Sequence, residues 1–242
     1  MHIKDKLGMD IQGLIEHGPI TIVAFGDSVT HGIQKTSNDY ECVYWNVLRQ
    51  KLNAVRDAIP VNVINAGIGG IDAKKSVERL DRDVLRYHPD LVIVCFGLND
   101  VNGTKEDYIE ALTTIFSRIQ ESGADVVFLT PNMLNTYTAE DVQPQFAEYS
   151  KVTAAYQNEG KMDAFMEAAT ALATRMGVTV CDCYGEWKKL YAQGVDTTQL
   201  LVNRINHPTP AMHKLFADKL FEVILQPDEV RTDLQVDGMY KG

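Results

Sequence analysis

The chain is predicted to fold as a three-layer α/β/α protein, in which a central parallel sheet of about five strands lies between two layers of helices. Two observations predict this fold. Short apolar runs of strand length alternate along the chain with longer segments whose apolar residues recur at helical spacing. Several of these runs also stop abruptly at glycine and small polar residues, as strands do where they end in ligand-binding loops of an open sheet. Such alternation favours parallel strands joined by right-handed crossovers.

The expected elements follow one another in the order that this fold requires. Residues 3–17 carry Ile11, Leu14 and Ile15 at helical spacing, which predicts a lead-in helix within residues 1–18. A chain of 242 residues buries one sizeable core, so a single domain over residues 1–242 is expected. Strands are expected at residues 20–25, 61–65, 91–96, 126–129 and 178–181, and helices at 40–58, 73–87, 105–122, 160–176 and 209–225.

Two segments do not fit this alternation. Residues 132–160 form a long, polar and aromatic connection after the fourth expected strand, which predicts a lid or a substrate wall at the end of the sheet. An ordinary surface loop with a short helix fits the same composition. Residues 227–242 form a C-terminal tail that mixes charged and apolar residues, and either packing on a neighbour or fraying would suit it.

The most informative segment follows the first expected strand, where the apolar run from Ile22 to Phe25 stops at Gly26-Asp27-Ser28. A serine on a tight turn at the carboxyl end of a buried strand is typical of a nucleophile. Asp27 is expected to organise this turn through hydrogen bonds to backbone N–H groups. The alternative is a plain β-turn, since glycine, aspartate and serine are all common turn residues. The rest of the chain favours the nucleophile.

Two later strands end in similar loops. After the β-branched run at residues 61–64, glycine occupies three of the four positions 67–70, which lets backbone N–H groups approach a ligand closely. The spacing lacks the dinucleotide fingerprint and the phosphate-loop lysine, so nucleotide binding is disfavoured. The third strand runs into residues 97–100 (Gly-Leu-Asn-Asp), and residues 206–208 (Asn-His-Pro) stand just before the last expected helix.

These four segments, in this order, resemble the motifs of the SGNH hydrolases, also called the GDSL esterase/lipase family, over residues 21–225. The resemblance implies a flavodoxin-like fold and a carboxylic ester hydrolase that needs no metal or cofactor. It makes Ser28 the nucleophile and His207 the general base. A serine hydroxyl is a weak nucleophile until a base removes its proton, and a neutral imidazole can accept that proton near working pH.

The resemblance also implies an oxyanion hole, which stabilises the negative charge that builds on the ester oxygen. Its donors would be the Ser28 backbone N–H, the Asn99 side chain and one glycine N–H. Gly70 is the first choice for that glycine and Gly67 is the second. Asp100 is expected to organise the turn after Asn99.

The chain departs from the family pattern at the acid of the catalytic triad. The family has this acid three residues before the histidine, and Arg204 occupies that position here. We expect a main-chain carbonyl near residues 203–204 to hold the imidazole of His207, so that the serine and the histidine work as a dyad. The side chain of Asn203 is then dispensable. Asp182, at the end of the fifth expected strand, is the other candidate, although an acid there more often caps the following helix.

Composition and charge exclude several classes of function. The net charge of −10 disfavours a nucleic-acid binder or a protein that binds an anionic membrane, because both need a basic face. No run of about 18 apolar residues predicts a membrane span, and the first residues lack the apolar core of a signal peptide. The four cysteines show no zinc spacing and suit a reduced, cytoplasmic protein. The sequence leaves homo-oligomerisation open.

The resulting hypothesis is a serine esterase that hydrolyses short acyl esters, with acetyl favoured, of a carbohydrate or a similar polar alcohol. The choice of acyl group and alcohol rests on the family resemblance. A lysophospholipase or a thioesterase of the same family is the alternative within the class. Two alternatives are not enzymes. One is a binding protein that kept the fold, which the missing acid favours, and the other is a flavodoxin-like binder that uses the glycine turn for phosphate.

Overall fold

The computed structural model describes residues 2–34, 38–55 and 59–225. Its centre is a five-stranded parallel sheet with the strand order β2-β1-β3-β4-β5, which confirms the predicted fold class. Each strand begins and ends within two residues of its expected position. The strands are β1 (Ile20–Gly26), β2 (Val61–Gly67), β3 (Leu91–Cys95), β4 (Asp125–Leu129) and β5 (Thr179–Cys181).

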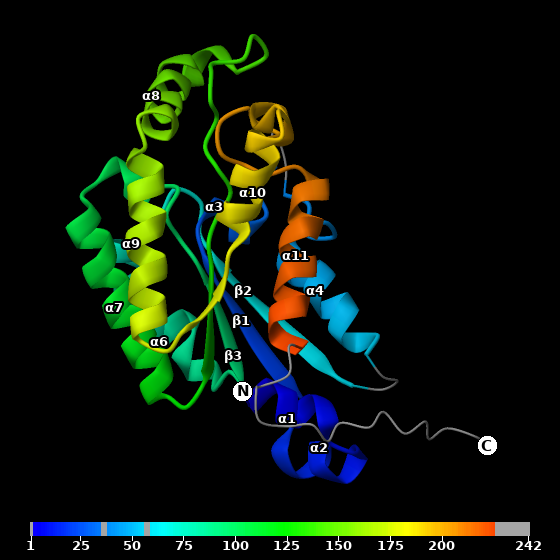
Figure 1. Cartoon of the computed structure of the whole chain (residues 1–242). Coiled ribbons are helices and arrows are strands. Elements are labelled where there is room, and N and C mark those ends of the chain that lie inside the picture. Colours follow the sequence, from blue (N-terminus) through cyan, green and yellow to red (C-terminus); the bar gives the residue numbers. More distant parts are fainter. Residues whose placement is uncertain (1, 35–37, 56–58, 226–242) are drawn as a thin grey trace.

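Helices cover both faces of this sheet (Figure 1). On one face lie α6 (Leu80–Asp83), α7 (Lys105–Glu121) and α9 (Lys161–Arg175), and on the other lie α4 (Tyr44–Asn53), α10 (Cys183–Ala192) and α11 (Pro210–Leu225). The remaining α-helices of the described residues are α1 (His2–Gly8), α2 (Ile11–His17), α3 (Ser28–His31), α5 (Ala73–Ser76) and α8 (Ala147–Asn158). The pair α1 and α2 lies at the end of the sheet where the strands begin, and α8 lies beyond the opposite end.

Apolar side chains of the sheet and the helices form one core. All five residues of β3 are buried, because this strand is central and helices cover both of its faces. The Thr104 side chain begins α7 by accepting a hydrogen bond from the backbone N–H of Asp107 at 3.2 Å. The stripe that α7 buries against the sheet consists of Tyr108, Ala111, Leu112, Ile115, Phe116 and Ile119.

Parallel register brings the ends of three strands together at one edge. Gly26, the last residue of β1, pairs with Gly67 of β2 on one side and with Cys95 of β3 on the other. The loops that follow these strands therefore leave the sheet side by side. Glycine is required at position 26, because a Cβ atom would lie 2.1 Å from Thr30 Oγ1 and 2.6 Å from the carbonyl oxygen of Cys95.

A buried arginine ties two of these strand ends to each other. Arg79 is 6% exposed and donates hydrogen bonds to the carbonyl oxygens of Ala66 at 2.7 Å and of Gly26 at 3.1 Å. Its guanidinium lies 4.5 Å from the ring centre of Phe25, and Asp83 supplies a partner carboxylate at 3.3 Å. One rigid guanidinium fork thus holds carbonyl groups near the ends of both β1 and β2.

The N-terminal segment differs from the expectation of one lead-in helix. It forms two helices, α1 and α2, because the side chain of Asp10 caps α2 and starts it anew. Ile11 and Ile15 of α2 are 63% and 71% exposed, so these two apolar side chains point to solvent. Ile3 and Leu7 of α1 are buried instead.

Other boundaries also differ. The expected helix at residues 73–87 is broken into α5, the 3₁₀ helix η1 (Val77–Arg79), α6 and the 3₁₀ helix η2 (Leu85–Tyr87). Arg79 stands at a break with φ −102° and ψ 1°, where its side chain turns toward the strand ends. The helix expected over residues 40–58 is shorter, since α4 spans only Tyr44–Asn53 and residues 56–58 lie outside the described part. The predicted tail at 227–242 also lies outside it.

We expect Arg79→Met to lower the free energy of unfolding by about 2–4 kcal/mol, because two buried carbonyl groups lose their charged donor, at about 1–3 kcal/mol each. Urea denaturation followed by circular dichroism would measure the change. Arg82→Met is the matched control, because the Arg82 side chain is 67% exposed and pairs with the same Asp83. Equal stability of the two variants would contradict the role assigned to Arg79.

Candidate active site

Ser28 stands where β1 gives way to α3. Asp27 caps this short helix, since its Oδ1 accepts a hydrogen bond from the backbone N–H of Val29 at 2.9 Å. Ser28 is therefore the first residue of α3, only 5% exposed, and its backbone N–H donates to no acceptor within the described part of the chain. The predicted turn-forming role of Asp27 corresponds to this cap.

His207 reaches Ser28 from the other end of the chain. Its Nε2 lies 2.9 Å from Ser28 Oγ, although the two residues are 179 positions apart. Burial lowers the pKa of His207 from 6.5 to about 4, because a charged imidazolium loses its hydration there. The ring is therefore neutral at physiological pH and can accept a proton from the serine hydroxyl.

The loop that carries His207 is shaped by Asn203. The loop closes on itself, since the Val202 N–H donates to the carbonyl oxygen of His207 at 2.8 Å. Inside it, Asn203 Oδ1 accepts hydrogen bonds from the backbone N–H groups of Ile205, Asn206 and His207 at 3.0–3.1 Å. One amide oxygen thus fixes three successive peptide groups, including that of His207 itself.

The predicted carbonyl partner of His207 is absent. Within the described residues, His207 Nδ1 has no hydrogen-bond partner, so the expectation of a main-chain carbonyl near residues 203–204 was wrong. The physical reason is that the Asn203 side chain gathers N–H groups, not carbonyl groups, in the loop. Arg204, at φ 58°, directs its guanidinium outward, and its Nε donates to Asp141 Oδ2 at 3.1 Å.

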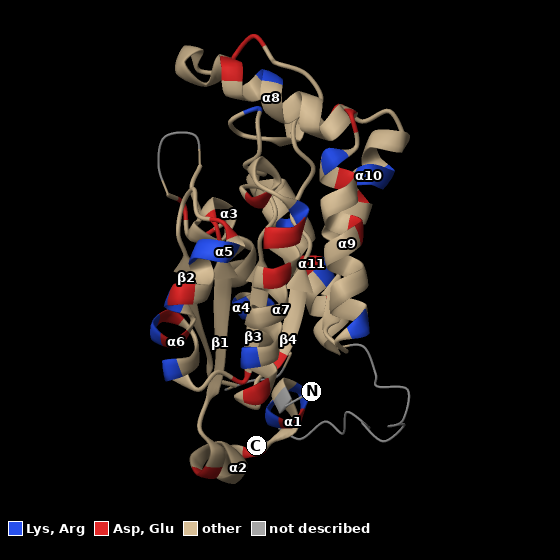
Figure 2. Cartoon of the chain, turned by 90° about the vertical axis from the view of Figure 1, so that its left-hand side faces the viewer, with Lys and Arg blue, Asp and Glu red and all other residues tan. Residues whose placement is uncertain are grey.

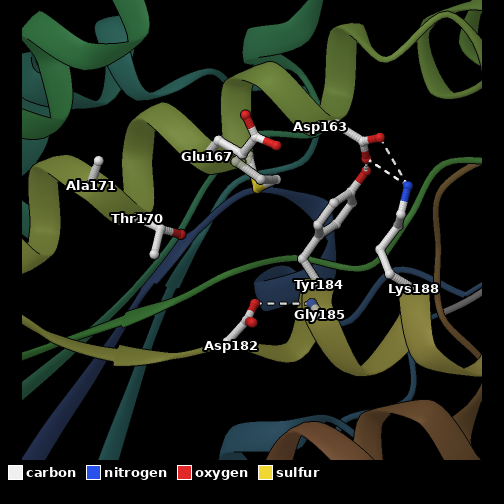
Figure 3. Close-up of a pocket in the computed structure, with 9 residues that line it drawn as sticks. Asp163, Glu167, Thr170, Ala171, Asp182, Tyr184, Gly185 and Lys188 are labelled. Carbon is white, nitrogen blue, oxygen red and sulfur yellow. Dashed lines mark hydrogen bonds and ion pairs between the residues drawn. The ribbon is translucent and has the colours of Figure 1, made fainter.

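Asp182 is also not the partner of His207. Its Oδ1 accepts hydrogen bonds from the Gly185 N–H at 2.9 Å and from Thr130 Oγ1 at 3.2 Å, so it caps α10. It lines a separate cavity of about 500 Å³ between α9 and α10 (Figure 3). In that cavity, Lys188 pairs with Asp163 at 2.8 Å. The capping role, which the sequence analysis kept as the alternative, is the one observed.

The glycine turn after β2 lies beside Ser28. A Cβ atom on Gly69 would stand 3.9 Å from Ser28 Cβ. Gly70 has φ +75°, is exposed, and its N–H donates no hydrogen bond within the described chain. Gly67, the second choice for the oxyanion hole, does not fit that role, because its N–H already donates to Asn65 Oδ1 at 2.9 Å.

Asn99 links the loops that follow all three strands. Its Nδ2 donates to the carbonyl oxygen of Ile71 at 3.1 Å and to Asp27 Oδ2 at 3.3 Å. Asp100 supports the same junction, since its Oδ1 accepts from the Ala73 N–H at 2.8 Å. Burial raises the pKa of both Asp27 and Asp100 to about 7. Asp100 adds to the shift of Asp27 by charge repulsion.

The segment at residues 132–160 is fixed to the histidine loop. Asn132 Nδ2 donates to the carbonyl oxygen of Asn206 at 2.9 Å, and the Asn135 N–H donates to that of Ile205 at 2.9 Å. The ring of Tyr149, on α8, packs against the small apolar cluster that contains Ile205. Figures 1 and 2 both show α8 standing beyond the carboxyl edge of the sheet. These contacts fix the segment beside the loop that carries His207.

Within residues 2–34, 38–55 and 59–225, the structure has neither a metal-binding cluster nor a membrane-spanning helix. No group of three or more His, Cys, Asp or Glu side chains in this range is arranged to hold a metal ion. No helix in it is long and apolar enough to cross a membrane. On the face drawn in Figure 2, acidic and basic residues are interspersed along the helices.

Sequence reasoning missed the residues that position the site. Arg79 lies in a charged helical segment and carries no local signal of its contact with β1. Asn203 does carry a local signal, because an asparagine at the start of a loop often accepts hydrogen bonds from the backbone N–H groups that follow it. Tyr149 was noted only as part of an aromatic segment, since its contacts lie with Ile205 and Asn102 from distant parts of the chain.

Comparisons with other proteins show which family the chain belongs to. The model of the GDSL-like Lipase/Acylhydrolase family matches residues 24–215. The chain is 33% identical over 100 residues to an arylesterase of Vibrio mimicus, a match that covers 38% of this chain and 50% of the relative. It is also 36% identical over 81 residues to the uncharacterized lipoprotein YqeF of Bacillus subtilis. This match covers 33% of this chain and 31% of the relative. The matched segments span half or less of these relatives.

Solved structures share the fold over most of their length. An α/β hydrolase from the metagenome of Lake Arreo, Spain, has a TM-score of 0.65 at 22% identity, covering 84% of this chain and 94% of that one. A catalytic mutant of an acetylxylan esterase from Geobacillus stearothermophilus has a TM-score of 0.65 at 18% identity, covering 85% and 94%. Since the family model also spans most of the sequence, the chain belongs to the GDSL-like lipase/acylhydrolase family.

Proposed function

We propose that this protein is a serine esterase that hydrolyses short acyl esters, with acetyl favoured, of a carbohydrate or a similar polar alcohol. The observation that carries the proposal is the 2.9 Å contact between Ser28 Oγ and the neutral, buried His207 Nε2. Gly70 and Asn99, beside this pair, supply the kinds of donor that an oxyanion hole needs.

The reaction follows from these positions. His207 Nε2 accepts the proton of Ser28 as Oγ attacks the ester carbonyl carbon, and the carbonyl electron pair moves onto oxygen. The N–H groups of Ser28 and Gly70 and the Asn99 amide then stabilise this oxyanion. When it collapses, the bond to the alcohol oxygen breaks and His207 returns the proton to that oxygen. A water activated by His207 then releases the acid from the acyl-serine by the same steps.

Asn99 must exchange one of its present hydrogen bonds to take part. Both hydrogens of its amide point at protein acceptors, to Ile71 at 3.1 Å and to Asp27 at 3.3 Å. The longer contact is the one that a developing oxyanion would replace. Because the pKa of Asp27 is raised to about 7 by burial, part of its population is protonated near neutral pH and holds Asn99 less strongly.

The base works in this proposal without a carboxylate partner. For Nε2 to accept a proton, the neutral ring carries its hydrogen on Nδ1, which has no partner among the described residues. Orientation comes from the backbone of the loop, which Asn203 fixes through three N–H groups. A Ser28–His207 dyad that the loop positions replaces the triad in this proposal.

The substrate class is supported by what the related proteins are described to be. One of the solved structures with this fold is described as an acetylxylan esterase, and one relative as an arylesterase. A lysophospholipase or thioesterase remains the alternative within the family. The intact serine–histidine contact argues against a non-catalytic binder.

Ser28→Ala should lower kcat for p-nitrophenyl acetate by about 10³-fold or more and abolish labelling by a fluorophosphonate probe, because the variant loses the hydroxyl that lies 2.9 Å from His207 Nε2. Intact-protein mass spectrometry would record the labelling. Ser122→Ala is the control, since Ser122 is an exposed serine at the end of α7 and should leave both measurements as in the wild type. Labelling that persists in Ser28→Ala would refute the assignment.

Asn203→Ala should lower kcat by about 10- to 10²-fold with a smaller change in KM, in contrast to the expectation from the sequence. The reason is that the loop loses the acceptor for three peptide groups, and a small displacement of His207 costs rate steeply. Asn203→Asp keeps that acceptor oxygen and should recover most of the activity. Steady-state kinetics with p-nitrophenyl acetate, beside melting curves, would measure both. A wild-type kcat in Asn203→Ala would contradict the role.

The pH profile should reflect the buried histidine. Since the pKa of His207 is lowered to about 4, the neutral base is already present above that pH, and kcat/KM should rise through about pH 4 instead of 6.5. Hydrolysis of p-nitrophenyl acetate from pH 3.5 to 8, with circular dichroism to confirm folding, measures this. A rise centred near pH 6.5 that persists in both Asp27→Asn and Asp100→Asn would contradict the prediction.

A further inference from the structure

We propose that Tyr149 and Asn102 form a subsite that binds hydroxyl groups on the alcohol portion of the ester. The inference rests on the proposed function and deepens it, because it names the residues that would select a polyhydroxylated alcohol such as a pyranose. It is carried by the position of the two side chains between the loops that bear Asn99 and His207.

The location is defined by contacts on both sides. Asn102 Nδ2 donates to the carbonyl oxygen of Asn99 at 3.0 Å and to the hydroxyl of Tyr149 at 3.3 Å. The ring of Tyr149 packs on the cluster of Ala139, Val142 and Ile205, and Ile205 lies two residues before His207. Tyr149, on the wall built by residues 132–160, therefore links the two sides of the site. Its hydroxyl binds Asn102 on the oxyanion side, and its ring packs on the cluster with Ile205 on the base side.

The wall holds this tyrosine in a fixed position. Within α8, Ser150 and Thr153 bind the buried Asn135, whose Nδ2 donates to Ser150 Oγ at 2.9 Å and whose Oδ1 accepts from Thr153 Oγ1 at 2.6 Å. The Asn135 N–H is in turn bound to the carbonyl of Ile205 at 2.9 Å. A substrate thus meets a preorganised hydroxyl, which costs less conformational entropy to bind than a mobile side chain would.

The polar atoms of the pair are complementary to an alcohol that carries several hydroxyl groups. Tyr149 accepts a hydrogen bond from Asn102, and its own O–H hydrogen is not donated to any described residue. Asn102 is exposed, and its amide oxygen accepts no hydrogen bond from the described chain. The pair thus offers one donor and one acceptor, and vicinal hydroxyl groups can satisfy both. Burial also raises the pKa of Tyr149, which keeps the hydroxyl protonated as a donor.

The test compares two acetate esters that differ in the hydroxyl groups of the alcohol. Cyclohexyl acetate and a monoacetylated methyl xylopyranoside have similar six-membered rings, and only the second carries free hydroxyl groups. We expect Tyr149→Phe to lower the ratio of kcat/KM for the pyranoside acetate to that for cyclohexyl acetate by about 5- to 10-fold, the loss of one neutral hydrogen bond. Phenylalanine retains the ring that packs on Ile205, so the fold of the wall is kept.

Tyr137→Phe is the matched control. Tyr137 lies on the same segment, but its hydroxyl donates to Asp196 at 2.7 Å and accepts from Gln199 at 3.0 Å, so both of these hydrogen bonds are made within the protein and the ratio should stay at the wild-type value. An unchanged ratio in Tyr149→Phe, whether both rates fall together or neither falls, would overturn the subsite. A wild-type enzyme that hydrolyses p-nitrophenyl acetate but neither ring ester would overturn it as well. Failure on all three esters would refute the proposed function itself.

Discussion

Parallel pairing of β1 with both β2 and β3 is the constraint on which the candidate site depends. The register sets Gly26 level with Gly67 and with Cys95, so three loops leave the sheet at one edge. Two side chains then hold the strand ends and the loops together. Arg79 binds carbonyl groups of β1 and β2, and Asn99 binds Ile71 and Asp27. A shift in register by one residue would displace every donor of the proposed oxyanion hole.

The same edge carries buried charge that costs stability. Asp27 and Asp100 are nearly inaccessible, and their pKa values rise to about 7 because desolvation disfavours the charged form. A raised folded pKa means that the folded state binds protons more tightly than the unfolded state. Stability from these groups is therefore present below the ordinary value of 3.8 and is lost as pH rises toward 7. In exchange, the two carboxyl groups accept hydrogen bonds from the backbone N–H groups of Val29 and Ala73 and so fix the loops of the site.

In the proposed dyad, His207 is held without a triad acid. A triad acid orients the ring directly, through a charged hydrogen bond to Nδ1. In this chain the position of that acid is taken by Arg204, which binds Asp141 on the wall. Asn203 instead fixes the peptide groups that carry the ring, and Pro208 pairs with Leu201 to close the loop. The position of the imidazole is thus set by the loop that carries it and by the contacts of this loop with residues 132–160.

The sequence by itself determined the layers of the fold, because hydrophobic periodicity reports directly on which residues are buried. The strand ends at Gly26 and Gly67 and the segment bearing Asn99 could be located in the same way, and the family motifs pointed to Ser28 and His207. It could not determine that α2 exposes Ile11 and Ile15, since a helical stripe does not say whether a neighbour covers it. The contacts of Asn203 are local in the sequence, but those of Arg79 and Tyr149 were decided only by tertiary structure. Each of these two residues acts through contacts with backbone groups or side chains that are brought near by folding, and such contacts leave no periodic pattern in the chain.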